Sequence, residues 1–378
     1  MWLNQTGLTS NVFYKIAFSD DNNGWAVGER GTILHTTNGG NNWQDQSLLG
    51  NDFKGVACSD SNHAWVTGNN CIYGTTNGGS SWNILPGGLV SGNAATFIDS
   101  NYGWVVGSGV LHTTNGGASW LSQLSGTAFY GVAFTDRNHG WVVGYNGVIL
   151  HTTDEGNTWT AQTSGTTASL TDVAFTDTSN GWACCEDLPG TILHTTNGGN
   201  TWFSQTNLNT RAPTGISFTD NLHGWAVTVP DIIAHTIDGG TTWTSQYINV
   251  CTGFKGVATS RNSVWVVGTF GTILRTQNTL TDVSENSYQL PTELHLQQNY
   301  PNPFNSKTEI SYSLPTSGKV NLTVFDLMGR KVTTLVNEFQ TPNQCRVSFD
   351  GSGLATGVYF YRLNVNGISE SKKMMLIK

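Results

Sequence analysis

The sequence has few charged residues, 11% of its 378 positions, against about a quarter in an average soluble protein. No stretch reaches the roughly 18 consecutive apolar residues of a membrane helix, which excludes a spanning protein. Met1 and Trp2 open the chain without the basic and apolar regions of a signal peptide. Residues 1–281 hold 8 Lys and Arg against 17 Asp and Glu, and the whole chain has a net charge of −8. An acidic main body argues against a nucleic-acid partner.

The cysteines form no CxxC pair, which excludes the common zinc and redox motifs. Five of the six occupy positions where other repeats carry ordinary strand or loop residues, so we interpret them as structural thiols, with one or two disulfides as the alternative. The six are Cys58, Cys71, Cys184, Cys185, Cys251 and Cys345.

Glycine, in contrast, is abundant, with 45 residues, and it recurs with tryptophan in a repeat. A Gly-Trp-x-Val-Gly motif and its variants return every 37 to 43 residues, at Trp25, Trp65, Trp104, Trp141, Trp182, Trp225 and Trp265. Each unit contains four short apolar runs separated by Gly- and Asn-rich turns, which predicts a four-stranded sheet. A sheet repeated with this period is typical of a propeller blade. The sequence therefore predicts a seven-bladed β-propeller over residues 1–276.

The last repeat lacks its fourth run, and the N-terminus matches the missing piece. Trp2 precedes Trp25 by 23 residues, just as Trp159 precedes Trp182. We therefore expect residues 1–7 to supply the outer strand of the last blade and to remove a free sheet edge.

Six of the repeats contain a turn such as Thr36-Thr-Asn-Gly-Gly-Asn-Asn-Trp43. This turn resembles the bacterial neuraminidase repeat, or Asp-box. An Asn or Asp side chain there accepts N–H groups of its own turn, glycine permits positive φ, and the aromatic fills the gap between sheets. We interpret the boxes as determinants of the fold. Together with Gly-Trp-x-Val-Gly, they resemble the propellers of photosystem II stability and assembly factors, a resemblance that implies a non-catalytic scaffold for another protein.

Residues 277–293 lose the repeat and form a predicted linker, and a second module follows at 294–378. Alternating apolar residues at 320–324, 331–336, 345–349 and 358–365 predict a small Ig-like β-sandwich. The segments Leu296–Asn305, Val324–Arg330, Gly357–Arg362 and Lys372–Lys378 resemble the type A sorting domain of type IX secretion; an ordinary adhesion module is the alternative.

The sorting resemblance implies export to the medium or the outer surface of a Bacteroidota-like bacterium. Such cargo normally starts with a secretion signal, and this chain begins within a repeat, so we expect a trimmed sequence.

A sialidase is excluded because the five arginines before residue 281 cannot form its arginine trio. A glycoside hydrolase would need two carboxylates about 5 to 10 Å apart, and Asp172, Glu186, Asp187 and Asp231 are the candidates. Loop carboxylates are more often turn formers, so we expect no catalytic residue and no cofactor. The repeated histidines fall one per blade and cannot cluster on a metal, and Asp20-Asp21-Asn22-Asn23 fits a plain turn better than a calcium loop.

The predicted binding site is a ring at the start of the inner strands, where side chains differ from blade to blade. Variable chemistry on a fixed frame is typical of recognition. Apolar residues just before the ring, such as Phe13 and Phe254, fit either the mouth or the top of the core. The ring consists of Tyr14, Lys54, Asn93, Tyr130, Thr171, Thr214 and Lys255, and its predicted neighbours are Glu29, Arg30, Tyr145, Asn146, Glu186, Asp187 and Asp231. We expect a monomer that binds a protein or a glycan there; a carbohydrate-active enzyme or lectin-like binder is the alternative.

Overall fold

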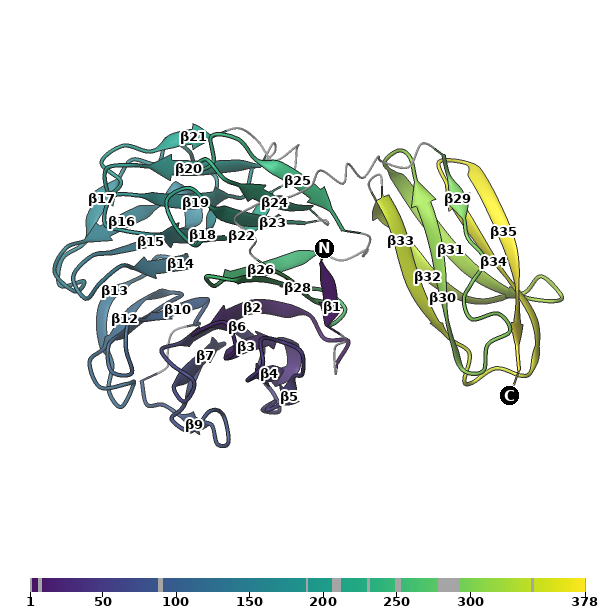
Figure 1. The fold of residues 1–378 in the computed structure, drawn as a ribbon, viewed down its shortest axis with the longest axis horizontal. Coiled ribbons are helices and arrows are strands. Elements are labelled where there is room, and N and C mark those ends of the chain that lie inside the picture. The colour runs from purple at the N-terminus through teal and green to yellow at the C-terminus, as the bar shows by residue number, and fades with distance from the viewer. Residues whose placement is uncertain are drawn as a thin grey trace. The chain divides into compact units, whose positions relative to one another are not determined.

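The described residues of this computed structural model form two compact units, a ring of seven four-stranded sheets and a smaller tail (Figure 1). Within them the chain is all-β, with no α-helix, and no helix in the same ranges is long and apolar enough to cross a membrane. The described ranges are 2–5, 9–87, 91–187, 190–205, 212–229, 232–248, 253–277, 293–340 and 343–377.

Each blade is one antiparallel sheet whose strands follow one another from the channel outward. The inner strands are β2 (Phe13–Phe18), β6 (Phe53–Cys58), β10 (Ala94–Phe97), β14 (Phe129–Phe134), β18 (Leu170–Phe175), β22 (Pro213–Phe218) and β26 (Phe254–Thr259). The second strands are β3 (Gly24–Gly28), β7 (Ala64–Gly68), β11 (Gly103–Val106), β15 (Gly140–Gly144), β19 (Gly181–Cys185), β23 (Gly224–Thr228) and β27 (Ser263–Gly268).

The two outer positions complete the sheets. The third strands are β4 (Ile33–Thr36), β8 (Cys71–Thr75), β12 (Gly109–Thr113), β16 (Ile149–Thr152), β20 (Thr191–Thr195), β24 (Ile232–Thr236) and β28 (Ile273–Gln277). The outer strands of blades 1 to 6 are β5 (Gln44–Asp45), β9 (Asn83–Ile84), β13 (Leu121–Ser125), β17 (Thr160–Gln162), β21 (Phe203–Gln205) and β25 (Thr244–Tyr247). Each inner strand contacts that of the next blade and β26 contacts β2, so the ring is closed. The predicted seven-bladed β-propeller is confirmed.

The seventh blade takes its outer strand from the other end of the chain. β1 (Leu3–Gln5) pairs with β28 in the register Leu3↔Arg275, Asn4↔Leu274 and Gln5↔Ile273. Most of the predicted linker, residues 278–292, lies outside the described residues, so the domain boundaries stay predictions.

Aromatic stacking joins neighbouring blades, because the tryptophan of a second strand lies face to face on a phenylalanine of the next inner strand. Five such pairs have ring centroids 3.5 to 3.6 Å apart: Trp65–Phe97, Trp104–Phe134, Trp141–Phe175, Trp182–Phe218 and Trp265–Phe18. The indole N–H of each also donates to a turn carbonyl of the next blade, as from Trp141 to Gly198 O at 3.1 Å. Cys58 and Thr259 take the phenylalanine position in blades 2 and 7. Trp25 and Trp225 therefore lack this stacking partner.

The tail consists of two sheets around one core. One sheet has the order β29 (His295–Leu296), β30 (Lys307–Leu314), β33 (Asn343–Asp350), and the other β32 (Lys331–Gln340), β31 (Gly318–Asp326), β34 (Gly357–Val365), β35 (Ile368–Leu376). Both sheets bury side chains in that core, among them Tyr312 and Phe349 from one and Tyr361 and Leu376 from the other. Its Ig-like relationship stays a prediction.

Four propeller cysteines follow the structural interpretation, whereas the tail cysteine differs; Cys251 lies outside the described residues. Cys58, Cys71, Cys184 and Cys185 are free thiols, whereas Cys345 is disulfide-bonded. Burial raises the pKa of the Cys185 thiol to about 12, so this thiol is protonated and unreactive at neutral pH.

Candidate functional site

The turns of each blade lie at two opposite ends of the channel. In blade 1, the Gly39 N–H donates to Asn22 O at 2.9 Å, which places the strand 3–4 turn beside the strand 1–2 turn. At the other end, the Leu48 N–H donates to Gly31 O at 2.9 Å, which places the connection to blade 2 beside the strand 2–3 turn. We call this second end the mouth. The inner strands begin there, since the Glu29 N–H donates to Val12 O at 2.9 Å.

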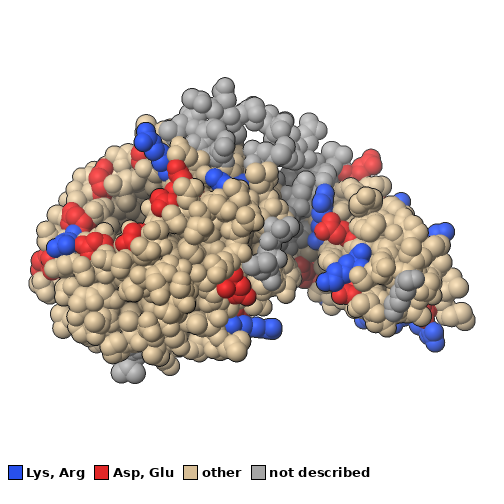
Figure 2. Space-filling view, turned by 60° about the horizontal axis from the view of Figure 1, so that its bottom comes forward, with Lys and Arg blue, Asp and Glu red and all other residues tan. Residues whose placement is uncertain are grey.

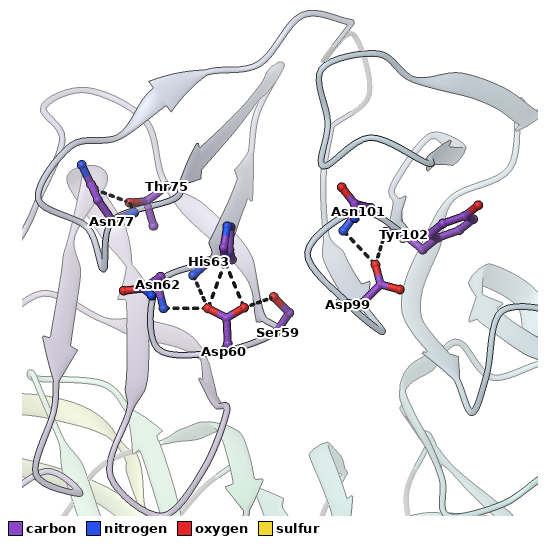
Figure 3. Close-up of polar contacts among 9 residues, drawn as sticks. All are labelled: Ser59, Asp60, Asn62, His63, Thr75, Asn77, Asp99, Asn101 and Tyr102. Atoms are coloured by element: carbon purple, nitrogen blue, oxygen red, sulfur yellow. Dashed lines mark hydrogen bonds and ion pairs between the residues drawn. The ribbon is translucent and has the colours of Figure 1, made fainter.

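The end opposite the mouth is built from self-contained turns. In blade 1, the Thr36 hydroxyl accepts the Gly40 N–H at 2.8 Å and donates to the Asn38 side chain at 3.0 Å. Gly40 has φ 94, a conformation that favours glycine. Figure 3 shows the corresponding Thr75 and Asn77 of blade 2 close to the turn that contains Asp60. The polar groups of these turns satisfy one another, which supports a role in folding.

The strand 1–2 turns at this end use a carboxylate in the same way. Asp60 accepts hydrogen bonds from the backbone N–H groups of Asn62 and His63 at 2.7 and 2.9 Å and contacts the His63 ring nitrogen (Figure 3). In blade 3, Asp99 accepts the backbone N–H groups of Asn101 and Tyr102 in the same way. Burial alone would raise the pKa of Asp177, but hydrogen bonds from Asn180, Ser179 and Asn221 outweigh it and lower that pKa to about 2. These carboxylates hold turns together.

The possible calcium segment at Asp20 follows the same pattern. Its carboxylate accepts the N–H groups of Asn22 and Asn23 at 2.7 and 2.8 Å. Among the described residues, no group of three or more His, Cys, Asp and Glu side chains is placed to hold a metal ion.

An ion pair spans the channel below the mouth. In each blade the residue directly after the predicted ring position faces its neighbours closely, and a Cβ added to Gly131 would lie 3.0 Å from the Asp172 Cα. In blade order these residues are Lys15, Gly55, Ala94, Gly131, Asp172, Gly215 and Gly256. Only the first and fifth blades carry long side chains, and Lys15 Nζ lies 2.8 Å from Asp172 Oδ2. Asp172 is 9% exposed and also accepts the Ile216 N–H at 3.1 Å. Asp172 therefore neutralises a lysine across the channel, and sequence analysis had noted it only as a possible catalytic acid.

The predicted ring residues lie directly above this pair. In six blades the ring residue is the extra residue of a β-bulge, as between Phe13 and Lys15. Three of the ring side chains hold the next blade. Asn93 donates to Phe129 O at 2.8 Å, Thr171 to Pro213 O at 3.0 Å and Thr214 to Phe254 O at 2.9 Å. Tyr14 instead donates to the Glu29 carboxylate at 3.4 Å. Part of the ring thus fixes the inner strands, and Lys54, Tyr130 and Lys255 complete it.

The strand 2–3 turns surround the ring and contain non-glycine residues at positive φ. The η1 turn (Glu29–Gly31) places Arg30 at φ 55 and the η2 turn (Tyr145–Gly147) places Asn146 at φ 58. The same turn has Asn70 at φ 58 in blade 2 and Phe270 at φ 55 in blade 7. Phe270 is 74% exposed and Tyr145 62%. Asn70 and Phe270 were not predicted from the sequence, although each lies two residues after the glycine that ends its second strand, as Arg30 does.

The carboxylates predicted near the mouth differ in their surroundings. Glu29 also accepts the Val12 N–H at 3.2 Å, and Asp187 accepts the Thr191 N–H at 3.0 Å. Glu186 is exposed, and Asp231 lies outside the described residues. Figure 2 shows acidic side chains around a hollow in the ring of blades, on a surface where charged residues are otherwise sparse.

The repeated third-strand histidines belong to the frame. His112, His151 and His194 stack on the tryptophan of their own blade at 4.6 to 4.8 Å, and His35 and His235 do so at 4.2 and 4.0 Å. Burial lowers the pKa of all five, and that of His235 falls to about 4.

His235→Gln is expected to make the propeller less sensitive to acid between about pH 6.5 and pH 4. An unfolded histidine has a pKa of about 6.5, so below that pH the unfolded chain takes up a proton that the folded one does not. Stability is lost as the pH falls towards the folded pKa of about 4, by up to about 3 kcal/mol. Urea unfolding as a function of pH measures this loss. His295→Gln, at an exposed tail position, is the control, and equal pH profiles for His235→Gln and the parent would contradict the assignment.

Two family models together match most of the chain. One, described as photosynthesis system II assembly factor YCF48, matches residues 1–89, 121–215 and 204–297. The other, described as a secretion system C-terminal sorting domain, matches residues 298–378. No curated protein is significantly similar in sequence.

Several solved structures share the fold. YCF48 bound to a D1 peptide is 20% identical, with a TM-score of 0.63 over 74% of this chain and 97% of that chain. YCF48 from Cyanidioschyzon merolae is 21% identical, with a TM-score of 0.61 over 72% and 98%. PorZ, described as an essential bacterial surface component of the type-IX secretion system of Porphyromonas gingivalis, is 16% identical, with a TM-score of 0.54 over 97% of this chain and 60% of that chain.

Proposed function

This chain belongs to the family of the photosynthesis system II assembly factor YCF48 and ends in a secretion system C-terminal sorting domain, and we propose on this basis that it is an exported, non-catalytic scaffold that binds a protein at the propeller mouth. The tail carries the propeller through type IX secretion to the medium or the outer surface of a Bacteroidota-like bacterium. Domains 1–276 and 294–378, joined by the linker 277–293, divide these two tasks.

The observation that carries the binding role is the strained, exposed set of turns at the mouth. A non-glycine residue at positive φ costs on the order of 1 kcal/mol, and less for Asn; four mouth turns contain one, at Arg30, Asn70, Asn146 and Phe270, whereas Glu155 is the example in the described turns of the other end. Such strain is found mainly where side chains must be held for recognition. The turns at the other end satisfy their own polar groups, so the mouth is the better candidate surface.

Two further facts support a protein ligand and a non-catalytic role. A YCF48 of the same fold is bound to a D1 peptide in its solved structure, although a sequence identity of 20% supports only a shared fold with this chain. Asp172, the most buried of the candidate acids in the described ranges, is neutralised by Lys15 and hydrogen-bonded to Ile216, which removes it from the pair of carboxylates that a glycosidase needs.

Replacing Tyr14 and Tyr130 by alanine is expected to weaken partner binding by roughly 2 kcal/mol or more, or about 30-fold. Both are half-buried ring residues, and the bulged backbone that holds them does not depend on their rings. The measurement is quantitative pull-down from the extracellular fraction of the producing bacterium, with a parallel glycan array. Leu121→Ala, on an exposed outer strand, is the control. Unaltered capture by the double variant would move the site away from the mouth, and binding to glycans alone would favour a lectin.

A further inference from the structure

Three acidic side chains at the mouth, Glu29, Asp52 and Asp187, are committed to the protein's own turns. Glu29 accepts hydrogen bonds from the Val12 N–H and the Tyr14 hydroxyl. Asp52 accepts the Arg30 N–H at 2.8 Å, and Asp187 accepts the Thr191 N–H at 3.0 Å. Each carboxylate thus braces a turn, and its charge is partly satisfied by N–H and O–H donors.

The lysines at the mouth are not committed in this way. Lys54 and Lys255 hold ring positions in blades 2 and 7, and within the described ranges neither ammonium group makes a hydrogen bond or an ion pair. Lys15 lies between them in blade 1. Its side chain is 21% exposed, and its ammonium has one carboxylate partner, Asp172, although it can donate three hydrogen bonds.

Charge is unevenly distributed across the mouth. The three lysines occupy three consecutive blades, 7, 1 and 2, where Glu29 and Asp52 also lie with their hydrogen bonds to the turns. Glu186 and Asp187 belong to blade 5 on the other side of the channel, together with Asp172, the partner of Lys15. The five small residues that take the place of Lys15 and Asp172 in the other blades add no charge between the two sides. A ligand carboxylate is consequently favoured over blades 7, 1 and 2 and disfavoured over blade 5.

An exposed aromatic ring lies in the same sector. Phe270 is 74% exposed in the strand 2–3 turn of blade 7, and Phe254, the residue before Lys255, pairs with Gly268 at the start of that turn. The Gly271 N–H donates to Asn11 O at 2.9 Å, so the turn adjoins the entry to blade 1. Phenylalanine has no polar group, which suits an apolar side chain better than a sugar hydroxyl.

We infer that the mouth binds an acidic polypeptide segment, with its carboxylates over Lys54, Lys15 and Lys255 and an adjacent apolar side chain on Phe270. The segment lies across the mouth, because the Lys15–Asp172 ion pair spans the channel beneath it. This inference rests on the proposed function, a protein partner at the mouth, and adds the chemistry of that partner.

The test uses the full chain and a fluorescent peptide of alternating Glu and Leu, compared with a Gln and Leu peptide and with an oligogalacturonate. We expect the Glu peptide to bind, the Gln peptide to bind about tenfold more weakly, and added salt to reduce the difference. Lys54→Gln with Lys255→Gln is expected to remove this difference, and Phe270→Ala to weaken both peptides. Lys319→Gln with Lys331→Gln, which removes two exposed tail charges, is the matched control.

Three results would overturn the inference: equal binding of the Glu and Gln peptides, no effect of the mouth lysines, or binding of the oligogalacturonate without the Glu peptide. Circular dichroism checks that each variant remains folded. The parent could fail to bind the Glu peptide and yet capture a protein that the Tyr14→Ala, Tyr130→Ala variant no longer captures. In that case the proposed function stands and this inference alone fails.

Discussion

Removing residues 1–8 is expected to lower the free energy of unfolding of the propeller by roughly 3 to 5 kcal/mol, as for the loss of a buried aromatic residue. The truncation removes β1 and leaves β28 as an unpaired edge, which also favours aggregation. It removes Trp2 as well, whose indole N–H donates to Gln246 at 2.7 Å and whose ring meets Trp225 edge to face at 5.6 Å.

Trp225 makes this loss larger than it would be in another blade. In most blades a phenylalanine of the inner strand stacks on the tryptophan of the preceding blade, but blade 7 has Thr259 at that position. Among the described residues of blade 7, Trp2 is therefore the aromatic side chain that contacts Trp225. Thermal and urea unfolding measure the effect. Leu3→Ser, at a side chain 58% exposed, is the control and should change little. An unchanged melting temperature after truncation would show that the ring does not need this strand.

Deleting residues 294–378 is expected to abolish release and surface display, leaving the propeller inside the cell envelope. The test is expression in a host with type IX secretion, with an export signal placed before the chain, and immunoblotting of cell and medium fractions. Among the described residues, the buried clusters of the propeller are formed by propeller side chains alone, so the truncated protein should still fold. The tail has its own core and should in turn export a fused carrier protein. Undiminished display without the tail would contradict the sorting role.

The fold could be predicted because each structural role recurs at one place in the repeat. Trp25 and its equivalents marked the second strands, and the spacing from Trp2 to Trp25 indicated where β1 pairs. In the tail, alternation located β31 to β34, but β35 was seen only as a terminal motif. Much of that strand is Ser, Glu and Lys, and only Met374 and Leu376 are buried in it, so its apolar pattern is short.

The site was harder to predict because its contacts join residues far apart in the sequence. The ring positions could be counted from the tryptophans, yet the sequence does not show that the Asn93 side chain donates to Phe129 O while Lys54 has no polar partner among the described residues. Opposite charges at Lys15 and Asp172, where other repeats have Gly or Ala, were a usable signal. Recognising their meeting requires knowing how wide the channel is.

Seven nearly alike units could form a ring that omits one unit, contains an additional unit, or includes a unit of a second chain. Lys15 and Asp172 distinguish two of these units, because their side chains meet only when the right number of blades separates them on each side of the ring. A ring of another size would leave Asp172, 9% exposed, without its cation, which costs several kcal/mol. The pair therefore favours rings with the correct number and order of units over rings of another size.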